Sequence, residues 1–305
     1  MPSVTTHLDV AAPCPQWFTW AINRPCESNV VEVQGCPIHY LTWPHDDEAD
    51  DARGVLFVHG GGAHANWWRF IAPFFTRDFR VAAIDISGMG DSGQRDEYSS
   101  EIRSLELSAV RDAAGLGPRP FVVGHSFGGY MTMRYAVEAG SELGGAVIVD
   151  SPIRRPADNR RVKFPPMAPQ RLYPDFDTAR SRFVLRPTQT CENEFIVEFI
   201  AKNSVKKIEA GWTWKFDPKV MNPRRFSEPF HEHLAKMQCR AALIYGEASA
   251  LLSRDTADYM SELMGPQAPV VEIPQAQHHI MLDQPLAFVA SLRMLLDGWV
   301  RAENT

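Results

Sequence analysis

The sequence lacks the features expected of a membrane, secreted or nucleic-acid-binding protein. No uninterrupted apolar run approaches the ~20 residues that a membrane helix requires. The N-terminus has neither a cationic start nor an apolar core, so we expect no secretory signal. The formal net charge of -6 gives no electrostatic reason to expect nucleic acid or an anionic membrane as a partner.

Cysteine pairs and metal-binding motifs are also missing. The five cysteines form no CxxC pair and are scattered at positions 14, 26, 36, 191 and 239. An odd, scattered set indicates free thiols in a reducing compartment, so we expect a cytoplasmic protein. Neither HExxH nor a spaced His/Asp cluster occurs, and His231-Glu232-His233 is interpreted as an exposed segment. We therefore expect no metal and no cofactor.

Short apolar runs separated by segments of helical spacing make up most of the chain. Runs of this kind are typical of strands that helices cover on both faces. They occur at 55–58, 81–84, 121–123, 146–149, 241–244 and 270–273, with helical spacing at 101–114, 127–139 and from 285 to about 301. This alternation predicts an α/β fold with a doubly wound, mostly parallel sheet.

Two regions depart from this alternation near the N-terminus. The first two dozen residues are expected to be irregular because prolines interrupt them. Residues 30–33 and 38–41 flank a Gln34-Gly35 turn and predict a hairpin at one edge of the sheet.

A third region, residues 152–229, is rich in proline and arginine and lies between two expected core strands. It contains helix-like pieces such as 194–208. We interpret it as an inserted, mainly helical cap subdomain, with residues 1–151 and 230–305 forming the core.

The segment Gly124-His125-Ser126-Phe127-Gly128 is a GxSxG motif between an expected strand and an expected helix. In this setting a serine sits on a sharp turn, with its hydroxyl exposed above the sheet. The two glycines allow the strand and the helix to approach where a β-carbon would clash. Ser126 is therefore the predicted nucleophile, although a five-residue pattern alone can occur by chance.

The glycine run His59-Gly60-Gly61-Gly62 follows the strand at 55–58. Its uncovered backbone N–H groups can face a substrate carbonyl, and a tetrahedral intermediate needs two such donors. We assign Gly61 and Phe127 as these donors, with Gly60 as the second choice for the first. A phosphate-binding loop is disfavoured because neither GxGxxG nor the GK[ST] ending is present.

The predicted general base is a histidine that follows the last core strand. His278 would lie at the carboxyl edge of the sheet beside Ser126, where a neutral imidazole can accept the hydroxyl proton. We prefer His278 to His279 because His279 adjoins an apolar stretch and is the better candidate for packing.

These motifs together resemble the α/β-hydrolase fold superfamily, in its serine-nucleophile branch with an inserted cap. The resemblance covers about residues 30–299 and includes Asp85-Ile86-Ser87-Gly88-Met89-Gly90-Asp91-Ser92, which is similar to a structural D-x-x-G-x-G-x-S loop of the family. It implies a Ser-His-acid triad. Many relatives carry the acid three residues after the glycine that ends the penultimate strand, and here Ser249 stands at that position.

Two other carboxylates are candidates for the acid. Asp150 ends the strand at 146–149, a place from which some family members supply theirs, and Glu247 lies near the usual position. We favour Asp150 because a carboxylate at a strand end can reach the histidine Nδ1–H. The alternative role for Asp150 is to cap the turn that follows it.

The expected reaction is hydrolysis of a carboxylic ester through an acyl-enzyme. A C–C bond hydrolase, a lactonase and an amidase remain alternatives on the same triad, as does a ligand-binding protein with little turnover. Aromatic residues indicate a small to medium, apolar or aromatic substrate, although each could equally pack the cap on the core. The predicted substrate contacts are His125, Trp67, Trp68, Trp212 and Trp214. The oligomeric state is not predicted.

Overall fold

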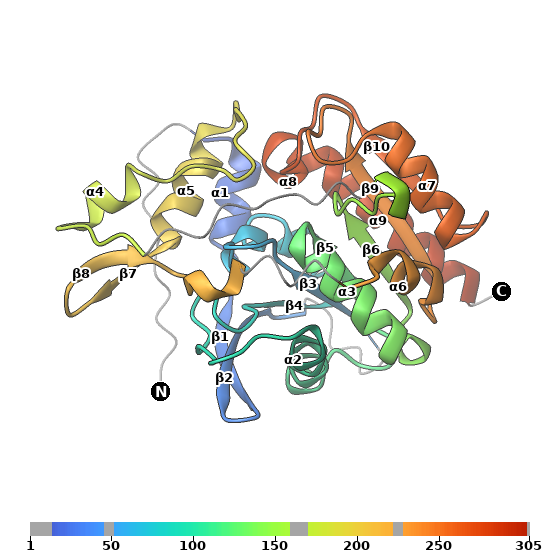
Figure 1. Cartoon of the computed structure of the whole chain (residues 1–305), viewed down its shortest axis with the longest axis horizontal. Coiled ribbons are helices and arrows are strands. Elements are labelled where there is room, and N and C mark those ends of the chain that lie inside the picture. The colour runs from blue at the N-terminus through green and yellow to red at the C-terminus, as the bar shows by residue number, and fades with distance from the viewer. Residues whose placement is uncertain (1–13, 46–51, 159–169, 222–227, 304–305) are drawn as a thin grey trace.

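The computed structural model describes residues 14–45, 52–158, 170–221 and 228–303. Its centre is an eight-stranded sheet in the order β1-β2-β4-β3-β5-β6-β9-β10 (Figure 1). The strands are β1 (Glu27–Val33), β2 (Cys36–Trp43), β3 (Gly54–Val58), β4 (Arg80–Ile84), β5 (Phe121–His125), β6 (Gly145–Val149), β9 (Ala241–Gly246) and β10 (Val270–Ile273). Every neighbouring pair from β4 to β10 is parallel. The predicted α/β fold with a mostly parallel sheet is confirmed.

The antiparallel pairings lie at one edge of the sheet, within the hairpin β1–β2 and between β2 and β4. Val30 pairs with His39, and Val33 pairs with Cys36 across the turn. Gln34 and Gly35 close the turn with φ angles of 49° and 72°, the left-handed conformation that two-residue hairpin loops require. The predicted edge hairpin is therefore confirmed.

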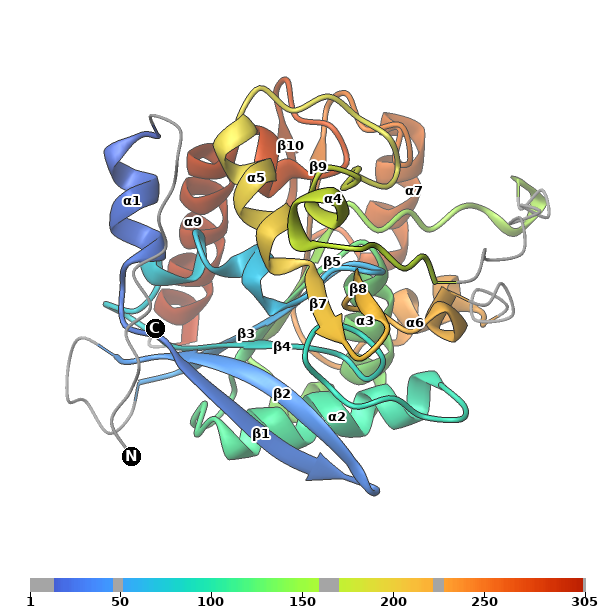
Figure 2. The ribbon, with the colours of Figure 1, turned by 90° about the vertical axis from the view of Figure 1, so that its left-hand side faces the viewer.

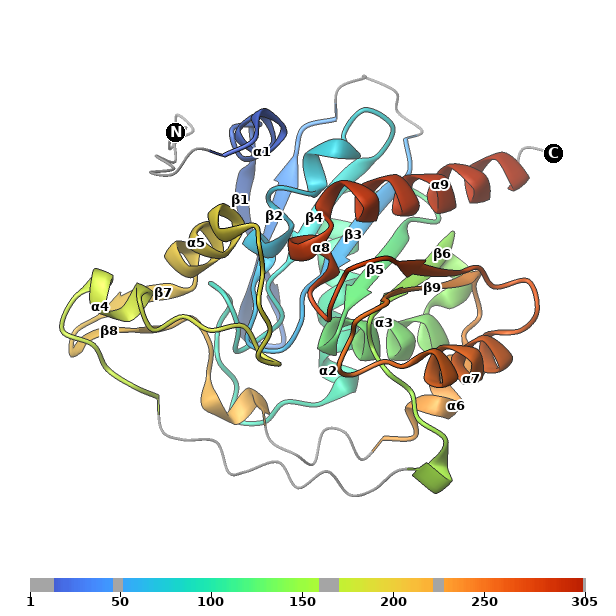
Figure 3. The same ribbon diagram turned by 90° about the horizontal axis from the view of Figure 1, so that it is seen from above.

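Helices cover both faces of the sheet. The longer ones around the sheet are α2 (Ser100–Ala113), α3 (Phe127–Glu138), α6 (Phe230–Lys236), α7 (Arg254–Met264) and α9 (Pro285–Glu303), with the short α8 (Ile280–Asp283) before α9. Figure 3 shows α9 along one face and α3 and α7 across the other. Short 3-10 turns occur at Ala65–Trp68, Ala72–Phe74, Gly140–Glu142, Pro156–Asp158 and Pro218–Met221.

The core divides into two apolar clusters, one on each face. Phe57 and Val123 pack with α9, whereas Leu56 and Val122 pack with α2 and α3. Successive strand residues point to opposite faces, so a strand buried on both faces is apolar at every position. This is why the parallel strands read as continuous apolar runs.

Two local predictions were wrong. The N-terminal region expected to be irregular contains α1 (Gln16–Ile22), which begins directly after Pro15 and buries Phe18, Ala21 and Ile22. Those three residues have the i, i+3, i+4 spacing of one helix face, a signal that the neighbouring prolines obscured. The predicted helix over 194–208 ends early, because α5 (Glu194–Asn203) is followed by strand β7 (Val205–Ile208).

The segment between β6 and α6 lies outside the main sheet. Its described part contains α4 (Phe176–Arg180), α5 and a hairpin of β7 with β8 (Gly211–Trp214), which lie together in Figure 2. It is joined to the loop after β4, where Lys215 Nζ lies 2.7 Å from Asp91 Oδ2 and Gly90 donates a backbone hydrogen bond to Lys215. His64 Nε2 also bonds Ser204 Oγ, at 2.9 Å.

Within the described residues, none of the helices combines the length and the apolar character needed to cross a membrane.

Candidate active site

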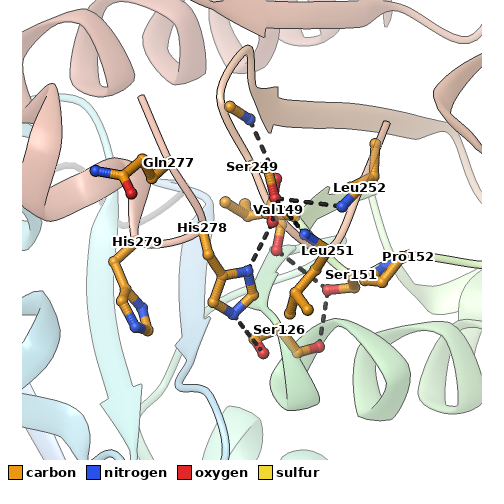
Figure 4. Close-up of polar contacts among 12 residues, drawn as sticks. Ser126, Val149, Ser151, Pro152, Ser249, Leu251, Leu252, Gln277, His278 and His279 are labelled. Carbon is orange, nitrogen blue, oxygen red and sulfur yellow. Dashed lines mark hydrogen bonds and ion pairs between the residues drawn. The ribbon is translucent and has the colours of Figure 1, made fainter. Parts of the chain in front are cut away.

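Ser126 occupies a strained turn between β5 and α3. Its φ and ψ angles are 52° and −117°, a conformation that costs a non-glycine residue of order 1–3 kcal/mol. The Ser126 N–H donates to Val149 O of the neighbouring strand at 2.9 Å, and Ser151 Oγ donates to Ser126 O at 2.7 Å (Figure 4). These bonds to Val149 of β6 and to Ser151, the second residue after β6, hold the turn in place.

Glycine is required on both sides of this serine. A β-carbon on Gly124 would lie 2.5 Å from Gly128 O, and one on Gly128 would lie 2.5 Å from Val58 O and His59 O. Those atoms are backbone and cannot move aside independently. The GxSxG spacing thus lets α3 begin directly against β3 and β5, and the serine hydroxyl remains partly exposed.

Two hydrogen bonds join three of the predicted site residues, Ser126, His278 and Asp150, and we call these three residues the relay. His278, in the loop between β10 and α8, places Nε2 3.0 Å from Ser126 Oγ. Its Nδ1 lies 2.7 Å from Asp150 Oδ2. Since an ionised carboxylate only accepts, Nδ1 carries the proton and Nε2 can accept one from the serine. His278 is 1% exposed and Asp150 is 0% exposed, so water does not compete with these contacts.

Asp150 follows β6 directly and is held in a left-handed conformation, with φ at 46°. Besides His278, it accepts a hydrogen bond from Ser249 Oγ at 2.6 Å and one from Gly246 N at 3.1 Å. Ser249 is the residue that stands where many relatives have their acid. It lies at the site and donates to a carboxylate that comes from the adjacent strand.

Glu247, the alternative acid, lies elsewhere. Its carboxylate accepts a hydrogen bond from Gln275 N at 2.9 Å, and its side chain is exposed. The structure shows no contact between Glu247 and His278 among the described residues. Asp150 is the carboxylate that meets the imidazole.

The glycine loop after β3 lies beside the serine. A β-carbon on Gly60 would lie 3.3 Å from Ser126 Cβ, so the backbone here approaches Ser126 closely. His59 fixes this loop because its Nδ1 donates to Gly60 O at 2.7 Å and its Nε2 accepts from Ile86 N at 3.1 Å. Gly61 follows at a half-buried position, and Phe127 is the first residue of α3. The N–H groups at the start of a helix have no partner within the helix, and its dipole favours negative charge there.

Three histidine rings lie together at the site. The ring centroids of His125 and His278 are 4.8 Å apart, and those of His278 and His279 are also 4.8 Å apart. Burial, followed by the charges of neighbouring histidines, lowers the pKa values of His125 and His279 well below the usual range. Both rings are therefore neutral at neutral pH.

Of the five predicted substrate contacts, two lie near the site, one lies in the core and two lie in the segment that follows β6. His125 adjoins Ser126 and donates from Nε2 to His278 O at 3.0 Å. The Trp67 ring lies 5.2 Å from the His279 ring, near the site. The structure places Trp68 in the core instead, fully buried against Phe57, so it offers no surface to a substrate.

Trp212 and Trp214 pack inside the segment that follows β6. Trp212 contacts Phe176, and Trp214 contacts Tyr173, with ring centroids 5.2 and 5.7 Å apart. The aromatic residue of this segment that reaches the glycine loop is Phe216, which lies 4.0 Å from the β-carbon position of Gly62. The sequence offered no means of separating Phe216 from the two tryptophans.

Sequence reasoning missed three further residues around the relay. His59 orients the glycine loop, Ser151 braces the turn at Ser126, and Ser249 donates to Asp150. The role of Ser249 could have been predicted, because a hydroxyl at the usual acid position can hydrogen-bond an acid that comes from another strand. The segment His231-Glu232-His233 was expected to be exposed, and this holds for Glu232, whereas His231 is half-buried and His233 is buried in α6, with its Nε2 3.2 Å from Glu228 Oε2.

A cavity of about 590 Å³ lies elsewhere on the molecule. Its lining includes Arg53, Asp78, Arg119 and Arg293, which stand before β3, β4 and β5 or on α9. It therefore opens at the amino ends of the strands, and none of the relay residues lines it.

Comparison with known proteins places this geometry in context. The profile of the alpha/beta hydrolase family matches residues 55–292, which include the glycine loop, the serine turn and the relay histidine. An esterase of Mycobacterium tuberculosis is 25% identical over 90% of this chain and 91% of its own length. A 2-hydroxy-6-oxo-6-phenylhexa-2,4-dienoate hydrolase of Comamonas testosteroni is 31% identical, over 34% of this chain and 38% of its own. The crystal structure of E-2-(acetamidomethylene)succinate hydrolase, 17% identical, superimposes with a TM-score of 0.73 over 90% of this chain and 100% of that one.

Proposed function

Since the chain belongs to the alpha/beta hydrolase family, we propose that it is a serine hydrolase that cleaves carboxylic esters through an acyl-enzyme. One observation carries the proposal: the unbroken contact from Ser126 Oγ through His278 to Asp150. A serine hydroxyl is a weak nucleophile, and a neutral imidazole at hydrogen-bond distance is what activates it.

In the first half of the proposed reaction, Ser126 Oγ attacks the ester carbonyl and its proton passes to Nε2 of His278. Asp150 stabilises the imidazolium that forms and keeps its ring oriented. The negative charge on the former carbonyl oxygen is stabilised by backbone N–H groups, for which we propose those of Gly61 and Phe127. Gly60 is the second choice for the loop donor.

The tetrahedral intermediate then collapses. The bond to the alcohol oxygen breaks, the alcohol takes the proton from Nε2 of His278, and the acyl group stays on Ser126. In the second half, His278 accepts a proton from water as the water attacks the acyl carbonyl. Collapse of the second intermediate releases the carboxylic acid and returns the proton to Ser126 Oγ.

We also propose that residues 152–229 form a cap over a core made of 1–151 and 230–305. The supporting contacts are those of Lys215 with Asp91 and of His64 with Ser204, which fasten the segment beside the glycine loop. Phe216, 4.0 Å from the β-carbon position of Gly62, and Trp67, whose ring lies 5.2 Å from that of His279, place aromatic side chains near the site, which favours an apolar or aromatic substrate of small to medium size. The five free cysteines support a cytoplasmic location.

A carbon–carbon bond hydrolase is the second candidate. The substrate named for the Comamonas testosteroni relative is a ketone without an ester bond. Its hydrolysis also requires attack on a carbonyl and stabilisation of an oxyanion, so the same residues could serve. The esterase of Mycobacterium tuberculosis matches nearly the whole chain, and for this reason we propose ester hydrolysis first.

The test is a rapid-mixing assay with a p-nitrophenyl ester, with mass spectrometry of the quenched protein. We expect a burst of p-nitrophenol and an acyl adduct on the peptide that contains Ser126, and we expect both to vanish in Ser126→Ala. Turnover that survives this substitution would overturn the proposed nucleophile. Absence of any adduct on the wild-type protein, with an ester or with the dienoate, would favour a ligand-binding protein.

A further inference from the structure

A second contact of serine, histidine and aspartate lies at the edge hairpin β1–β2. Ser28 Oγ lies 2.8 Å from His39 Nε2, and His39 Nδ1 lies 2.7 Å from Asp85 Oδ2. The corresponding distances in the relay are 3.0 and 2.7 Å. The proposed hydrolysis uses none of these three residues, which we call the edge relay.

The members of the edge relay become more buried from the serine to the carboxylate. Ser28 is exposed, whereas His39 is 6% exposed and Asp85 is 1% exposed. Ser28 and His39 belong to β1 and β2, which lie at the edge of the sheet in Figure 2. Asp85 follows β4, the strand that pairs with β2. Solvent therefore reaches the residue that carries the hydroxyl but not the pair behind it.

The ionised Asp85 sets the tautomer of His39. Burial raises the pKa of Asp85, but the hydrogen bond and charge of His39, with the charges of two further histidines, outweigh this and lower the pKa to about 2. An ionised carboxylate only accepts hydrogen bonds, so Nδ1 of His39 carries a proton. Nε2 of the neutral imidazole is then free to accept the proton of Ser28.

The surroundings of Ser28 differ from those of Ser126 in one respect that affects the rate. Ser126 directly precedes α3, and the first N–H groups of a helix have no partner within it. Ser28 is the second residue of a strand, so no helix begins behind it. Loss of one oxyanion donor slows attack on a carbonyl by ~10²- to 10³-fold. We therefore expect Ser28 to react more slowly than Ser126 and to keep the acyl group, because its hydrolysis needs the same stabilisation.

We propose that Ser28 is a second nucleophile, which takes one acyl group from an activated ester with His39 as its general base. Activated esters are those with a good leaving group, such as aryl esters and thioesters. Ser28 Oγ bonds to the acyl carbon, and the bond from that carbon to the leaving oxygen or sulfur breaks, with its electron pair on the leaving group. The serine proton passes to Nε2 of His39 and from there to water. Val30, opposite His39 in the hairpin and 62% exposed, offers apolar surface to a small acyl group.

The test uses the whole chain with Ser126→Ala, so that the faster nucleophile is absent. The protein is incubated for hours with p-nitrophenyl acetate, and acetylated peptides are quantified by mass spectrometry. Ser253 is the internal control, because it is exposed and its Oγ meets Thr256 at the start of α7. We expect acetylation at Ser28 to be at least ~10²-fold faster than at Ser253, which is the contribution of a general base.

His39→Gln tests the base directly, because glutamine can hydrogen-bond Ser28 but cannot take its proton at neutral pH. We expect the acetylation rate at Ser28 to fall by ~10²-fold or more, toward that of Ser253. Circular dichroism of the variant checks that it has folded.

The pH dependence provides a second test that needs no substitution in the edge relay. Burial lowers the pKa of His39, and Lys215 also lowers it, but the hydrogen bond and charge of Asp85, with the charge of Asp91, raise it above 6.5. The acetylation rate at Ser28 should therefore rise with pH and level off above the raised pKa. A hydroxyl without a base would instead react faster at every increase in hydroxide concentration.

The outcomes are separate from those that decide the proposed function. Acetylation at Ser28 no faster than at Ser253, an unchanged rate in folded His39→Gln, or a rate that never levels off with pH overturns the second nucleophile. The proposed function is decided by the rapid burst that depends on Ser126. Absence of that burst in the wild-type protein would leave the result at Ser28 standing.

Discussion

Replacement of Asp150 by asparagine is the most direct test of whether Asp150 is the acid that pairs with His278. The substitution preserves size, and asparagine tolerates the left-handed backbone that Asp150 adopts, with φ at 46°. It changes only which hydrogen bonds the two terminal atoms of the side chain can donate or accept. In the native site Oδ1 accepts from Gly246 N, while Oδ2 accepts from Ser249 Oγ and His278 Nδ1. The amide must present one oxygen and one NH₂ to these same neighbours.

The arrangement of these donors decides which way the amide turns. If its oxygen faces Gly246 N, its NH₂ faces His278, and the imidazole must then place its proton on Nε2, where it cannot accept one from Ser126. If its oxygen faces His278, its NH₂ meets the Gly246 N–H and a buried hydrogen bond is lost, at ~1–3 kcal/mol. The hydroxyl of Ser249 can rotate to suit either case. The unproductive tautomer is therefore the more stable.

The expected loss of kcat is ~10³- to 10⁴-fold, because both the tautomer and the charge that stabilises the imidazolium are lost. The assay is steady-state hydrolysis of a p-nitrophenyl ester, with the unfolding midpoint measured in parallel to exclude loss of the fold. Glu247→Gln is the matched control and should retain wild-type turnover. A value of kcat for Asp150→Asn within tenfold of wild type, or a comparable loss in Glu247→Gln, would refute this assignment.

Two further predictions concern hydroxyl and histidine partners of buried carboxylates. Ser249→Ala removes the 2.6 Å hydrogen bond to Asp150. We expect kcat/KM for the p-nitrophenyl ester to fall by roughly tenfold, or ~1.4 kcal/mol, and wild-type turnover in this variant would contradict a role for the Ser249 hydroxyl. For His39, burial lowers the pKa, but the hydrogen bond and charge of Asp85 outweigh this, so the pKa lies above 6.5 in the folded state. The stabilisation is then fully present below pH 6.5 and is lost as the pH rises through the raised value. Urea unfolding at about pH 6 and about pH 9 should therefore show a difference between wild type and His39→Gln that shrinks at the higher pH, and a constant difference would contradict the charge pairing.

Much of the core fold was predictable because there the local sequence pattern and the tertiary packing specify the same structure. The strands that surround the site are buried on both faces, so their sequences are apolar throughout, and the glycines at 124 and 128 are imposed by backbone atoms that a β-carbon would strike. Helix α1 was missed because prolines precede it, and β7 was missed because its residues continue the pattern of α5. Helix α1 packs on residues far along the chain, and Phe195 of α5 lies on its Phe18 with ring centroids 4.9 Å apart. Strand β7 instead pairs in a hairpin with the strand that follows it, β8.

In the site, too, residues that belong to one continuous motif could be predicted, whereas contacts between distant segments could not. Ser126 and the glycine loop lie in continuous motifs, so the sequence alone could place them. The contact of Trp67 with His279 and the packing of Trp68 in the core depend on which way two adjacent side chains point along a short 3-10 turn. The histidine cluster joins position 125 to positions 278 and 279, a separation that no spacing motif spans.

Position 150 carries a carboxylate and position 249 a serine, and the contact between them indicates how the acid of such a site can come from either of two strands. Ser249 and Asp150 lie within one hydrogen bond of each other, at the ends of the adjacent strands β9 and β6. Either position can therefore bring a carboxylate near His278, and two carboxylates at this distance could not both be ionised without strong repulsion. A serine at 249 avoids that conflict, and its hydroxyl donates to the carboxylate that remains. On this reasoning a serine at position 249 is the residue expected where position 150 supplies the proposed catalytic acid.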